Sequence, residues 1–505
     1  MNLAFVHNFP LFCIILTLFS GPCSMILPAK KARVLNLCVI TAVGLMSLLV
    51  LLEVCVSGSS YVYTMGHFPA PWGNEIRVGP LEAFMALFFS IVMLLSIVGG
   101  ASERLVEIDE SKENLYYVMV NLLLSSLIAL IYTNDLFTAY VFVEINTISA
   151  CGMIMIKQSG HTLEAATRYM IMSLLGSGLL LLGICFLYGL TGHLLMSNIK
   201  EEVAAIAAAG TYHAPLMVAV GLMCVGLAIK SALFPFHSWL PDAYGYSTVS
   251  SAAILSSLVS KGYIFLLIKI FYRVIGFDII CNSKIINIFF VFGIAGMMFG
   301  SISAAREFDI RRMIAFSSVA QIGYIYMGFG LGTNLGVLAS IYHILSHAAT
   351  KSLLFVSASG LSECSGDHRE LTKLTGAGYR NPLAGMAFTV GALSMIGFPL
   401  FSGFISKILF AQAAVNQTGK MLPTLIALAL STILNVIYFM RAVLIIYTPR
   451  KGAAAADESG YQRIRMRRHP EKIAVFVCFM LLNLVLGLMS QPIVELCLRG
   501  LEMFG

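Results

Sequence analysis

The sequence predicts an all-α integral membrane protein with about 14 transmembrane helices, for three reasons. Its 505 residues are 58% hydrophobic and only 11% charged, whereas a soluble domain needs much more polar surface. Apolar stretches of about twenty residues recur from end to end, and each is long enough to cross about 30 Å of hydrocarbon. None of the segments between them is long enough to bury a core of its own.

The predicted spans follow one another at short intervals. The first has no Lys or Arg ahead of its apolar run. It therefore lacks the basic region of a cleaved signal peptide and is expected to remain as a span. In order, the spans are expected near residues 5–27, 34–55, 80–100, 115–132, 136–156, 168–190, 214–236, 248–272, 282–304, 312–331, 334–360, 383–413, 421–447 and 472–496.

The Lys and Arg residues of the loops predict the orientation. With the N-terminus outside, the inside loops hold most of them, in agreement with the positive-inside rule. The sequence therefore predicts a multi-pass protein of the cell inner (cytoplasmic) membrane with both termini outside. The basic run after Gly460 is read as an orientation signal or as a contact for anionic lipids. The outside segments hold only Arg77, Lys200, Arg273, Lys284, Lys420 and Arg499.

The cysteines do not indicate a metal or cluster site. All 11 stand singly, without a C-x-x-C pair, so no iron–sulfur or structural zinc site is expected. The chain also lacks a Walker A motif and a dinucleotide fingerprint. We therefore expect no cofactor and no metal in this chain, and any redox or ATP chemistry would belong to another subunit.

Six basic residues fall inside predicted spans. Lys269 and Arg441 lie near span ends, from which their side chains are expected to reach water. The other four lie deep, and at roughly 2.5–3.5 kcal/mol each they would cost on the order of 10 kcal/mol on insertion. Residues this costly are expected to carry the function. These four are Lys230, Lys261, Lys351 and Lys407.

The first deep lysine has a candidate partner. Glu144 lies near the middle of the fifth span, where a lone carboxylate would be protonated or paired, and Lys230 is its expected partner. Pro235 is close enough to interrupt the seventh helix beside this lysine. A membrane tolerates such a break only where the freed backbone lines a hydrated or packed cavity. Lys261 follows in the eighth span, within Ser-Lys-Gly.

His343, His347 and Lys351 share one face of the eleventh span. Their i, i+4, i+8 spacing places neighbours about 6 Å apart along a helix. Because the pKa of histidine lies nearest neutrality, such a stripe can pass protons. Two other readings stay open. The histidines could simply pack against neighbouring helices, or bind zinc, although that face has no acidic or thiol ligand.

Lys407 lies in the twelfth span with Pro399 and Gly403, which predict a second break beside a buried lysine. Two interrupted spans indicate an internal duplication, namely two inverted five-helix repeats with broken seventh and twelfth helices. The expected segments are 1–110 (an N-terminal three-helix segment), 111–275 and 276–449 (the two repeats), and 450–505 (a cytoplasmic basic linker and the last transmembrane helix).

Together these residues predict a relay for protons or sodium ions. A nearby carboxylate stabilises the charged form of a lysine, and desolvation destabilises it. Lys230 would therefore keep its proton while Glu144 stays close, and would release it towards Lys261 when that contact loosens. The predicted order of the relay is Glu144, Lys230, Lys261, His343, His347, Lys351 and Lys407.

At these residues the sequence resembles the antiporter-like membrane subunit family shared by respiratory complex I, Mrp-type cation/proton antiporters (their D-type subunits) and membrane-bound hydrogenases. The resemblance covers residues 80–447 approximately. The motifs that carry it are Glu144 in the fifth span, the pattern Lys-x-x-x-x-Pro-x-His from Lys230 to His237 with Trp239-Leu-Pro-Asp242, Ser-Lys-Gly at 260–262, Arg-Arg-Met-Ile-Ala-Phe-Ser-Ser-Val-Ala at 311–320, and the His343/His347/Lys351 stripe.

The resemblance implies fourteen helices, inverted repeats, and breaks in the seventh and twelfth helices. It implies that Glu144 and Lys230 are the family's ion pair and that Lys261 is its connecting lysine. Lys407 would be the terminal lysine, where some relatives have glutamate, and Lys351 is less uniform in the family. The largest members continue into a lateral helix and a final span, so this chain is similar to the shorter type.

Two other functions are weighed. A stand-alone secondary transporter for a solute needs a central pocket whose charges suit its substrate. A membrane-embedded enzyme needs a catalytic constellation, and the loop residues form none that is recognisable. His237 and Asp242 are read either as the cytoplasmic mouth or as helix caps, and Glu53 and Glu82 as contacts to neighbouring subunits.

The expected partners are other membrane subunits of the same complex, including related antiporter-like subunits, together with the lipid bilayer and the transported H⁺ or Na⁺. No nucleic acid is expected. The sequence leaves open which complex this is: an Mrp antiporter, a hydrogenase, or an NADH- or ferredoxin-driven machine. It also leaves open the choice between H⁺ and Na⁺ and the direction of transport.

Overall fold

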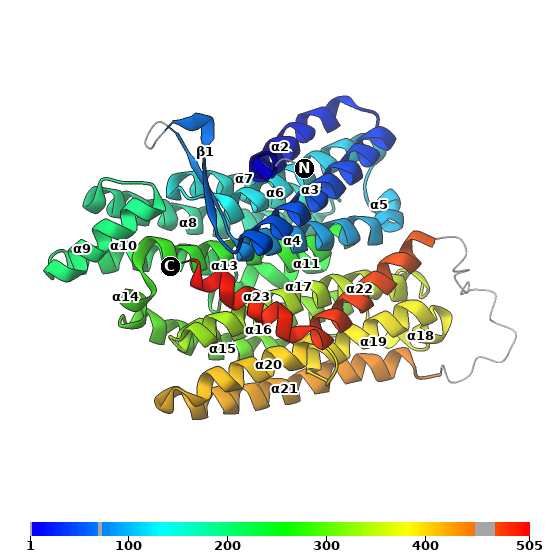
Figure 1. The fold of residues 1–505 in the computed structure, drawn as a ribbon. Helices are drawn as coiled ribbons and strands as arrows, with labels where there is room; N and C mark the ends of the chain where they lie inside the picture. The colour runs from blue at the N-terminus through cyan, green and yellow to red at the C-terminus, as the bar shows by residue number, and fades with distance from the viewer. Residues whose placement is uncertain (1–2, 69–72, 450–469, 505) are drawn as a thin grey trace, which may run out of the picture.

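The computed structural model describes residues 3–68, 73–449 and 470–504, and these form a bundle of helices that run side by side (Figure 1). The predicted all-α membrane fold is confirmed. Most of the basic linker predicted after span thirteen lies outside the described residues. The basic residues of that linker that are not described are Arg450, Lys451, Arg463, Arg465, Arg467 and Arg468.

The elements of the first half are α1 (Leu3–Val6), α2 (Phe9–Ile26), α3 (Ala29–Ser57), β1 (Tyr61–Thr64), η1 (Met65–His67), β2 (Glu75–Val78), α4 (Pro80–Gly99), α5 (Ala101–Glu107), η2 (Glu110–Lys112), α6 (Glu113–Tyr132), α7 (Leu136–Met155), α8 (Gly160–Thr191), α9 (Met196–Ala209), α10 (His213–Lys230), η3 (Phe236–Trp239), α11 (Leu240–Tyr246), α12 (Val249–Ile254), η4 (Leu255–Val259), α13 (Ser260–Lys269) and η5 (Ile270–Ile275).

The elements of the second half are α14 (Phe277–Cys281), α15 (Ile285–Arg306), α16 (Ile310–Gly330), α17 (Asn334–Glu363), η6 (Leu371–Leu374), α18 (Ala377–Arg380), α19 (Pro382–Ile396), α20 (Ser402–Val415), α21 (Thr418–Ile446), α22 (Pro470–Leu488) and α23 (Ser490–Glu502). Residues 249–275 form one continuous run in which η4 and η5 are π-helical turns on either side of α13.

Twelve helices of the described residues are long and apolar enough to cross a membrane. Two further predicted spans have a different form. The eleventh is the 30-residue α17, and the twelfth is divided between the shorter apolar helices α19 and α20. The total of about 14 and the inverted repeats remain predictions.

Both predicted helix breaks are present. Helix α10 ends at Lys230, and the chain passes through η3 before the short α11 begins. Helix α19 ends at Ile396, and α20 starts again at Ser402. Proline has no amide hydrogen to donate and fixes its own φ, which explains why both breaks contain one. Each break therefore leaves backbone carbonyls of the preceding helix without their intrahelical partners.

Three elements differ from the predicted pattern. Strands β1 and β2 form an antiparallel hairpin in the connection after α3. Helix α9 is a separate helix in the connection between α8 and α10. The last predicted span, 472–496, is in fact two helices, because α22 ends at Leu488 and α23 follows after Met489. Sequence hydropathy averaged over a window does not detect such a short interruption.

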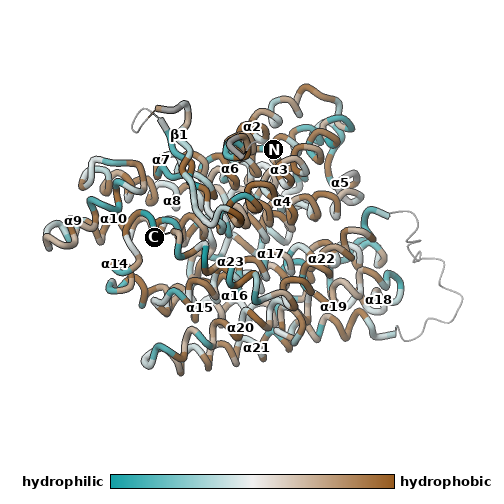
Figure 2. The backbone as a smooth tube through the Cα atoms, in the orientation of Figure 1, coloured by the Kyte–Doolittle hydropathy of each residue, from teal (hydrophilic) through white to brown (hydrophobic). Residues whose placement is uncertain are grey.

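Hydrophobic residues make up most of the length of the helices, and hydrophilic ones gather at helix ends and connections (Figure 2). Large apolar side chains such as Phe19, Ile171 and Leu444 are exposed on the outside of the bundle. A soluble protein would bury such residues, but a membrane protein turns them towards lipid.

The two ends of the described chain lie at the same end of the bundle. His7 is 3.5 Å from Glu53 near the end of α3, and it stacks on Tyr61 of β1. The neighbouring strand β2 carries Arg77, whose guanidinium donates to the carbonyl of Met503 at 3.0 Å. Both termini thus meet at the β hairpin, which agrees with an even number of membrane crossings.

The side on which the termini lie is a prediction that fusions can test. We expect alkaline phosphatase fused after Gly505 to be active, and a fluorescent protein fused at the same place to be dark, because the predicted location is outside. Fusions after Ser159, in a predicted inside loop, should give the opposite pattern. The prediction is wrong if the phosphatase is active only at Ser159.

Candidate ion-relay site

Glu144 and Lys230 form an ion pair between α7 and the end of α10. Their Oε1 and Nζ atoms are 3.9 Å apart, with 25% of the Glu144 side chain exposed and 0% of Lys230. Lys230 Nζ also donates to Thr147 Oγ1 at 2.7 Å. Because Lys230 is the last residue of α10, its ammonium lies at the negative end of that helix dipole. The helix break and the carboxylate therefore both stabilise the buried charge.

A group of hydroxyls and amides, which the sequence analysis did not identify, surrounds this pair. Thr147 Oγ1 lies 3.3 Å from the hydroxyl of Tyr263, which in turn donates to Asn146 Oδ1 at 3.0 Å. The Tyr263 ring centroid is 5.3 Å from Lys230 Nζ. Thr147 and Glu144 are three residues apart on α7, a helical spacing that could have indicated the shared face.

Lys261 is fully buried in α13, two residues before Tyr263. Its ammonium donates to the carbonyl of Ser256, which lies in the π-helical turn η4, and to Ser260 Oγ at 3.1 Å. A π turn shifts the register of the backbone bonds and is common at functional sites. The described residues show no direct bond between Lys261 and Lys230, but Tyr263, on the same helix as Lys261, lies against Lys230.

The stripe on α17 lies as its spacing predicts. The rings of His343 and His347 are 6.0 Å apart and nearly parallel, at 8°. Lys351 donates to the carbonyl of Ile314 at 2.8 Å and to Ser317 on α16. Among the described residues, His343 Nε2 and both ring nitrogens of His347 have no hydrogen-bond partner although they are buried. Buried polar groups in proteins are normally hydrogen-bonded, either to the protein or to ordered water.

Lys407 reaches back across the second break. Its ammonium donates to the carbonyl of Ile396, the last residue of α19, and to Thr432 Oγ1 at 2.9 Å. His343 Nδ1 is hydrogen-bonded to Ser406, the residue before Lys407. Lys407 is only partly buried, and its neighbour Ile408 is exposed.

The structure brings the predicted relay residues into two groups. In the first group, His343, His347 and Lys351 share α17, and the bond of His343 to Ser406 links them to Lys407. Lys261 belongs to the same group, because the turn η4 whose Ser256 carbonyl holds it packs against α17. The Glu144–Lys230 pair is the second group, beside Tyr263. Only the first and last members, Glu144 and Lys407, are partly exposed.

Backbone carbonyls, not carboxylates, hold most of these ammonium groups. Lys261, Lys351 and Lys407 each donate to a carbonyl, and Glu144 is the carboxylate that pairs with the remaining member. Carbonyl dipoles stabilise a charge without binding it as an opposite full charge does. Three of the four lysines are therefore held without an opposite full charge as their hydrogen-bond partner.

His237 and Asp242, expected at the cytoplasmic mouth or as caps, lie on separate short elements. Asp242 bridges two helices, with its carboxylate 2.6 Å from Arg312 and 3.0 Å from Arg168. The His237 ring stacks on Phe234, with centroids 5.4 Å apart. The cap reading is not supported for Asp242, whose carboxylate pairs with arginines of other helices and does not cap α11.

Two expectations about other charged residues were wrong. Lys269 does not reach water, because it is fully buried and donates to the carbonyls of Leu130, Ile131 and Thr133 at the end of α6. Glu82 does not face a neighbouring subunit, because it is fully buried and paired with Arg273. Arg273 is itself buried, in η5 at the end of the helical run 249–275. Tertiary packing covers these charges, which sequence position alone cannot show.

The remaining charges lie near the ends of helices. Arg441 is partly buried and donates to the carbonyls of Ala305 and Glu307 at 2.8 and 2.6 Å. Glu53 is mostly buried and its described partner is His7.

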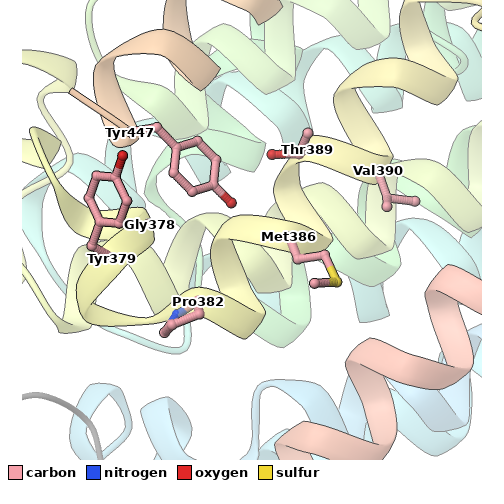
Figure 3. A pocket seen from close by; sticks show the side chains of 7 residues that line it. All are labelled: Gly378, Tyr379, Pro382, Met386, Thr389, Val390 and Tyr447. Carbon is pink, nitrogen blue, oxygen red and sulfur yellow. The ribbon is translucent and has the colours of Figure 1, made fainter.

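An open groove of about 610 Å³ lies beside α18 and α19 (Figure 3). It is lined by Tyr379, Met386, Thr389 and Tyr447, among others. A second groove near the β hairpin is lined by Asn74, Asp135 and His193 among others. Neither groove is lined by a predicted relay residue, so neither is the central charged pocket that a stand-alone solute carrier would need.

Comparison with known proteins identifies the family of this chain. Residues 133–437 match the model of a family described as NADH:quinone oxidoreductase/Mrp antiporter, transmembrane. The chain is 31% identical to the N subunit of NADH-quinone oxidoreductase from Desulforudis audaxviator, with 88% of each chain covered. It is 25% identical to the D subunit of the Na(+)/H(+) antiporter from Alkalihalophilus pseudofirmus, with 92% of this chain and 90% of the other covered.

Among solved structures, a chain of the Mrp complex from Dietzia sp. DQ12-45-1b has the same fold. The TM-score is 0.85 at 24% identity, over 99% of this chain and 97% of that chain. The predicted family resemblance is confirmed: this multi-pass membrane chain belongs to the NADH:quinone oxidoreductase/Mrp antiporter transmembrane family.

Proposed function

We propose that this chain is a proton- or sodium-translocating, antiporter-like subunit of a multi-subunit membrane complex. Its ions move along the relay from Glu144 to Lys407. One observation carries the proposal. The interior members of the line are sealed from the surface, while the two end members are partly exposed on different flanks of the bundle. This is the arrangement expected of a conduit that crosses the subunit from one side to the other.

The line crosses the bundle rather than following its helices. Glu144 lies on α7, and Lys407 lies on α20, on opposite flanks of the bundle in Figure 1. Residues of α7, α10, α13, α17 and α20 contribute to it in turn. A charge that moves along this line therefore travels partly in the plane of the membrane, from the flank of one neighbouring subunit towards the other. It also moves towards the two aqueous sides of the membrane.

The flank around Glu144 suits a protein partner. Phe137, Val141 and Ile148 are exposed on the same face of α7 as this carboxylate. An ionisable group facing lipid would be costly, whereas a neighbouring membrane subunit can cover it. The expected partners are therefore other membrane subunits, including related antiporter-like ones. The two relatives compared above are themselves named as subunits, which supports this expectation.

The first transfer follows from the Glu144–Lys230 contact. The ammonium of Lys230 keeps its proton while Glu144 is anionic and close. Lys261 first passes its own proton to the histidines of α17 and becomes a free amine. When a neighbouring subunit changes and the carboxylate moves away or is neutralised, the proton of Lys230 then moves to Lys261 past Thr147 and Tyr263. From there the histidines of α17 receive it, and Lys407 releases it.

The same proposal includes the orientation and the segments. The chain lies in the cell inner membrane with both termini outside. Residues 111–275 and 276–449 are two inverted repeats, preceded by the N-terminal segment 1–110 and followed by the linker and last helix in 450–505.

The glutamine variant Glu144→Gln tests the proposal in the assembled complex, reconstituted into liposomes with pH- and Na⁺-sensitive dyes. Glutamine keeps the size of the side chain but cannot carry a charge. Loss of one charged partner at a buried pair is worth about 1.5–3 kcal/mol, so we expect transport to fall about tenfold or more. The dye that responds in the wild type identifies the ion.

Glu164→Gln is the matched control, because Glu164 pairs with Arg168 at the exposed surface. It should leave transport unchanged. Normal transport by a fully assembled Glu144→Gln complex would contradict the proposed relay. Uptake of a solute by the isolated chain in liposomes would instead support a stand-alone carrier.

A further inference from the structure

Five buried polar side chains meet at the break between α19 and α20, and none belongs to the proposed relay. They come from four helices: two from α17, one from each side of the break, and one from α22. These residues are Ser346, Thr350, Ser394, Ser402 and Asn483. A cluster of this kind in a membrane protein must be satisfied internally, because lipid offers no hydrogen bonds.

The amide oxygen of Asn483 is the centre of the cluster. Asn483 Oδ1 lies 2.6 Å from Thr350 Oγ1, 3.2 Å from Ser394 Oγ and 3.4 Å from Ser402 Oγ. Its Nδ2 donates to the carbonyl of Phe479 at 3.0 Å, which fixes the orientation of the amide.

Three hydroxyls thus compete for an oxygen with two lone pairs. Each hydroxyl also has a second acceptor nearby. Thr350 can donate to the carbonyl of Ser346 at 2.8 Å, and Ser394 can pair with Thr350 at 3.1 Å or with Ser402 at 3.4 Å. The cluster therefore has several hydrogen-bond arrangements with similar geometry.

Four of the five members of the cluster lie beside a relay contact. Ser346 precedes His347, and Thr350 precedes Lys351. Ser402 is one helical turn before Ser406, which bonds to His343. On the other side of the break, Ser394 is two residues before Ile396, whose carbonyl holds the Lys407 ammonium.

The backbone around the cluster has little freedom. A side chain at Gly403 would meet the carbonyl oxygen of Ser394 at 1.8 Å, and one at Gly487 would meet that of Leu400 at 2.1 Å. Helix α22 thus packs directly against the break, one turn beyond Asn483. The Tyr342 hydroxyl of α17 also donates to the carbonyl of Leu486 in α22. The hydroxyls are the adaptable part of an otherwise fixed junction.

We propose that Asn483 is a positioning residue for the last step of the relay, an inference that rests on the proposed function. By bonding to both half-helices of the break and to α17, it holds the Ile396 carbonyl and Ser406 in register with His343. Because the hydroxyls have alternative arrangements, the backbone at the break can shift when Lys407 gains or loses its proton, and the cluster still keeps its hydrogen bonds. The competing explanation is that a buried asparagine only helps helices to pack.

Asn483→Leu separates these explanations when it is compared with Asn121→Leu. Asn121 is equally buried, and its bonds among the described residues go to Asn36 and Ser24, neither of which is a relay residue. For Asn483→Leu we expect transport per assembled complex to fall about tenfold, which is the effect of losing roughly one hydrogen bond that acts in the last transfer step. We also expect the pH profile of transport to change. Asn121→Leu should keep the wild-type rate and profile.

Two more variants make the test decisive. In Asn483→Asp, a protonated carboxyl can still accept from Thr350 and donate to Phe479, so transport should be largely restored. Thr350→Val removes one donor with little change in shape and should lower transport as Asn483→Leu does; it decides the matter if the leucine variant does not assemble. Wild-type transport by assembled Asn483→Leu or Thr350→Val, or an equal loss in Asn121→Leu, would overturn the inference. Normal transport by an assembled Glu144→Gln complex would instead contradict the proposed function on which this inference rests.

Discussion

Replacing Lys230 with alanine is expected to lower ion transport by the assembled complex about 100-fold. Alanine cannot carry a proton, so the charge would have to cross this position without a side chain to hold it. A charge at the centre of a bilayer costs roughly 2.5–3.5 kcal/mol on insertion scales, and 1.36 kcal/mol corresponds to about tenfold in rate. The measurement is the initial rate of ion flux in liposomes, divided by the amount of intact complex.

Lys269→Met is the matched control for this variant. Lys269 is another fully buried lysine, but its partners are three carbonyls at the end of α6 and it lies outside the proposed line. Its loss should reduce stability, because carbonyls are left unpaired, without changing the rate per intact complex. The relay role of Lys230 would be refuted if Lys230→Ala assembled normally and still transported ions at the wild-type rate.

Replacing Lys407 with alanine should have an effect of the same size, about 100-fold, at the other end of the line. The side chain that takes the charge from the histidines of α17 would be absent. The carbonyl of Ile396 and Thr432 Oγ1, which now hold the ammonium, would lose their partner. The same flux assay applies, and a native gel reports assembly.

Lys407→Glu distinguishes a titratable group from a merely structural contact. A protonated glutamic acid can donate to the Ile396 carbonyl and accept from Thr432, and it can also release its proton. We therefore expect Lys407→Glu to transport ions at least about tenfold faster than Lys407→Ala. Equal rates for the two variants would show that a titratable side chain is not needed at this position.

Much of the fold could be predicted from the sequence, because lipid imposes simple rules. Apolar runs of about twenty residues mark helices, since no other open structure satisfies its backbone in hydrocarbon. Pro235 and Pro399 mark the two breaks for the same reason, as each removes a backbone donor. The β hairpin, α9 and the division between α22 and α23 were missed, because short or amphipathic elements leave no comparable hydropathy signal.

The candidate site was only partly predictable. Deep lysines and the histidine spacing were visible, since charges in apolar runs are rare and helical periodicity is regular. Thr147, Tyr263 and Asn483 were not, because single hydroxyls and amides are common in spans and acquire meaning only from what they contact. Lys269 and Glu82 were misjudged for the converse reason. A position near a span end suggested that Lys269 reaches water, and location alone suggested that Glu82 contacts a neighbouring subunit, but neighbouring helices cover both side chains.

The sequence by itself determined that this chain lies in a membrane and at which residues two of its helices break. It also determined which charged residues are so costly to bury in lipid that a function is expected of them. These properties depend on local composition and spacing. Tertiary structure alone decided which charges meet: the 3.9 Å contact of Glu144 with Lys230, the carbonyls that hold Lys261, Lys351 and Lys407, and the burial of Glu82 against Arg273. Such contacts join residues far apart in the chain, and electrostatic energy depends on distance in space, which no one-dimensional pattern contains.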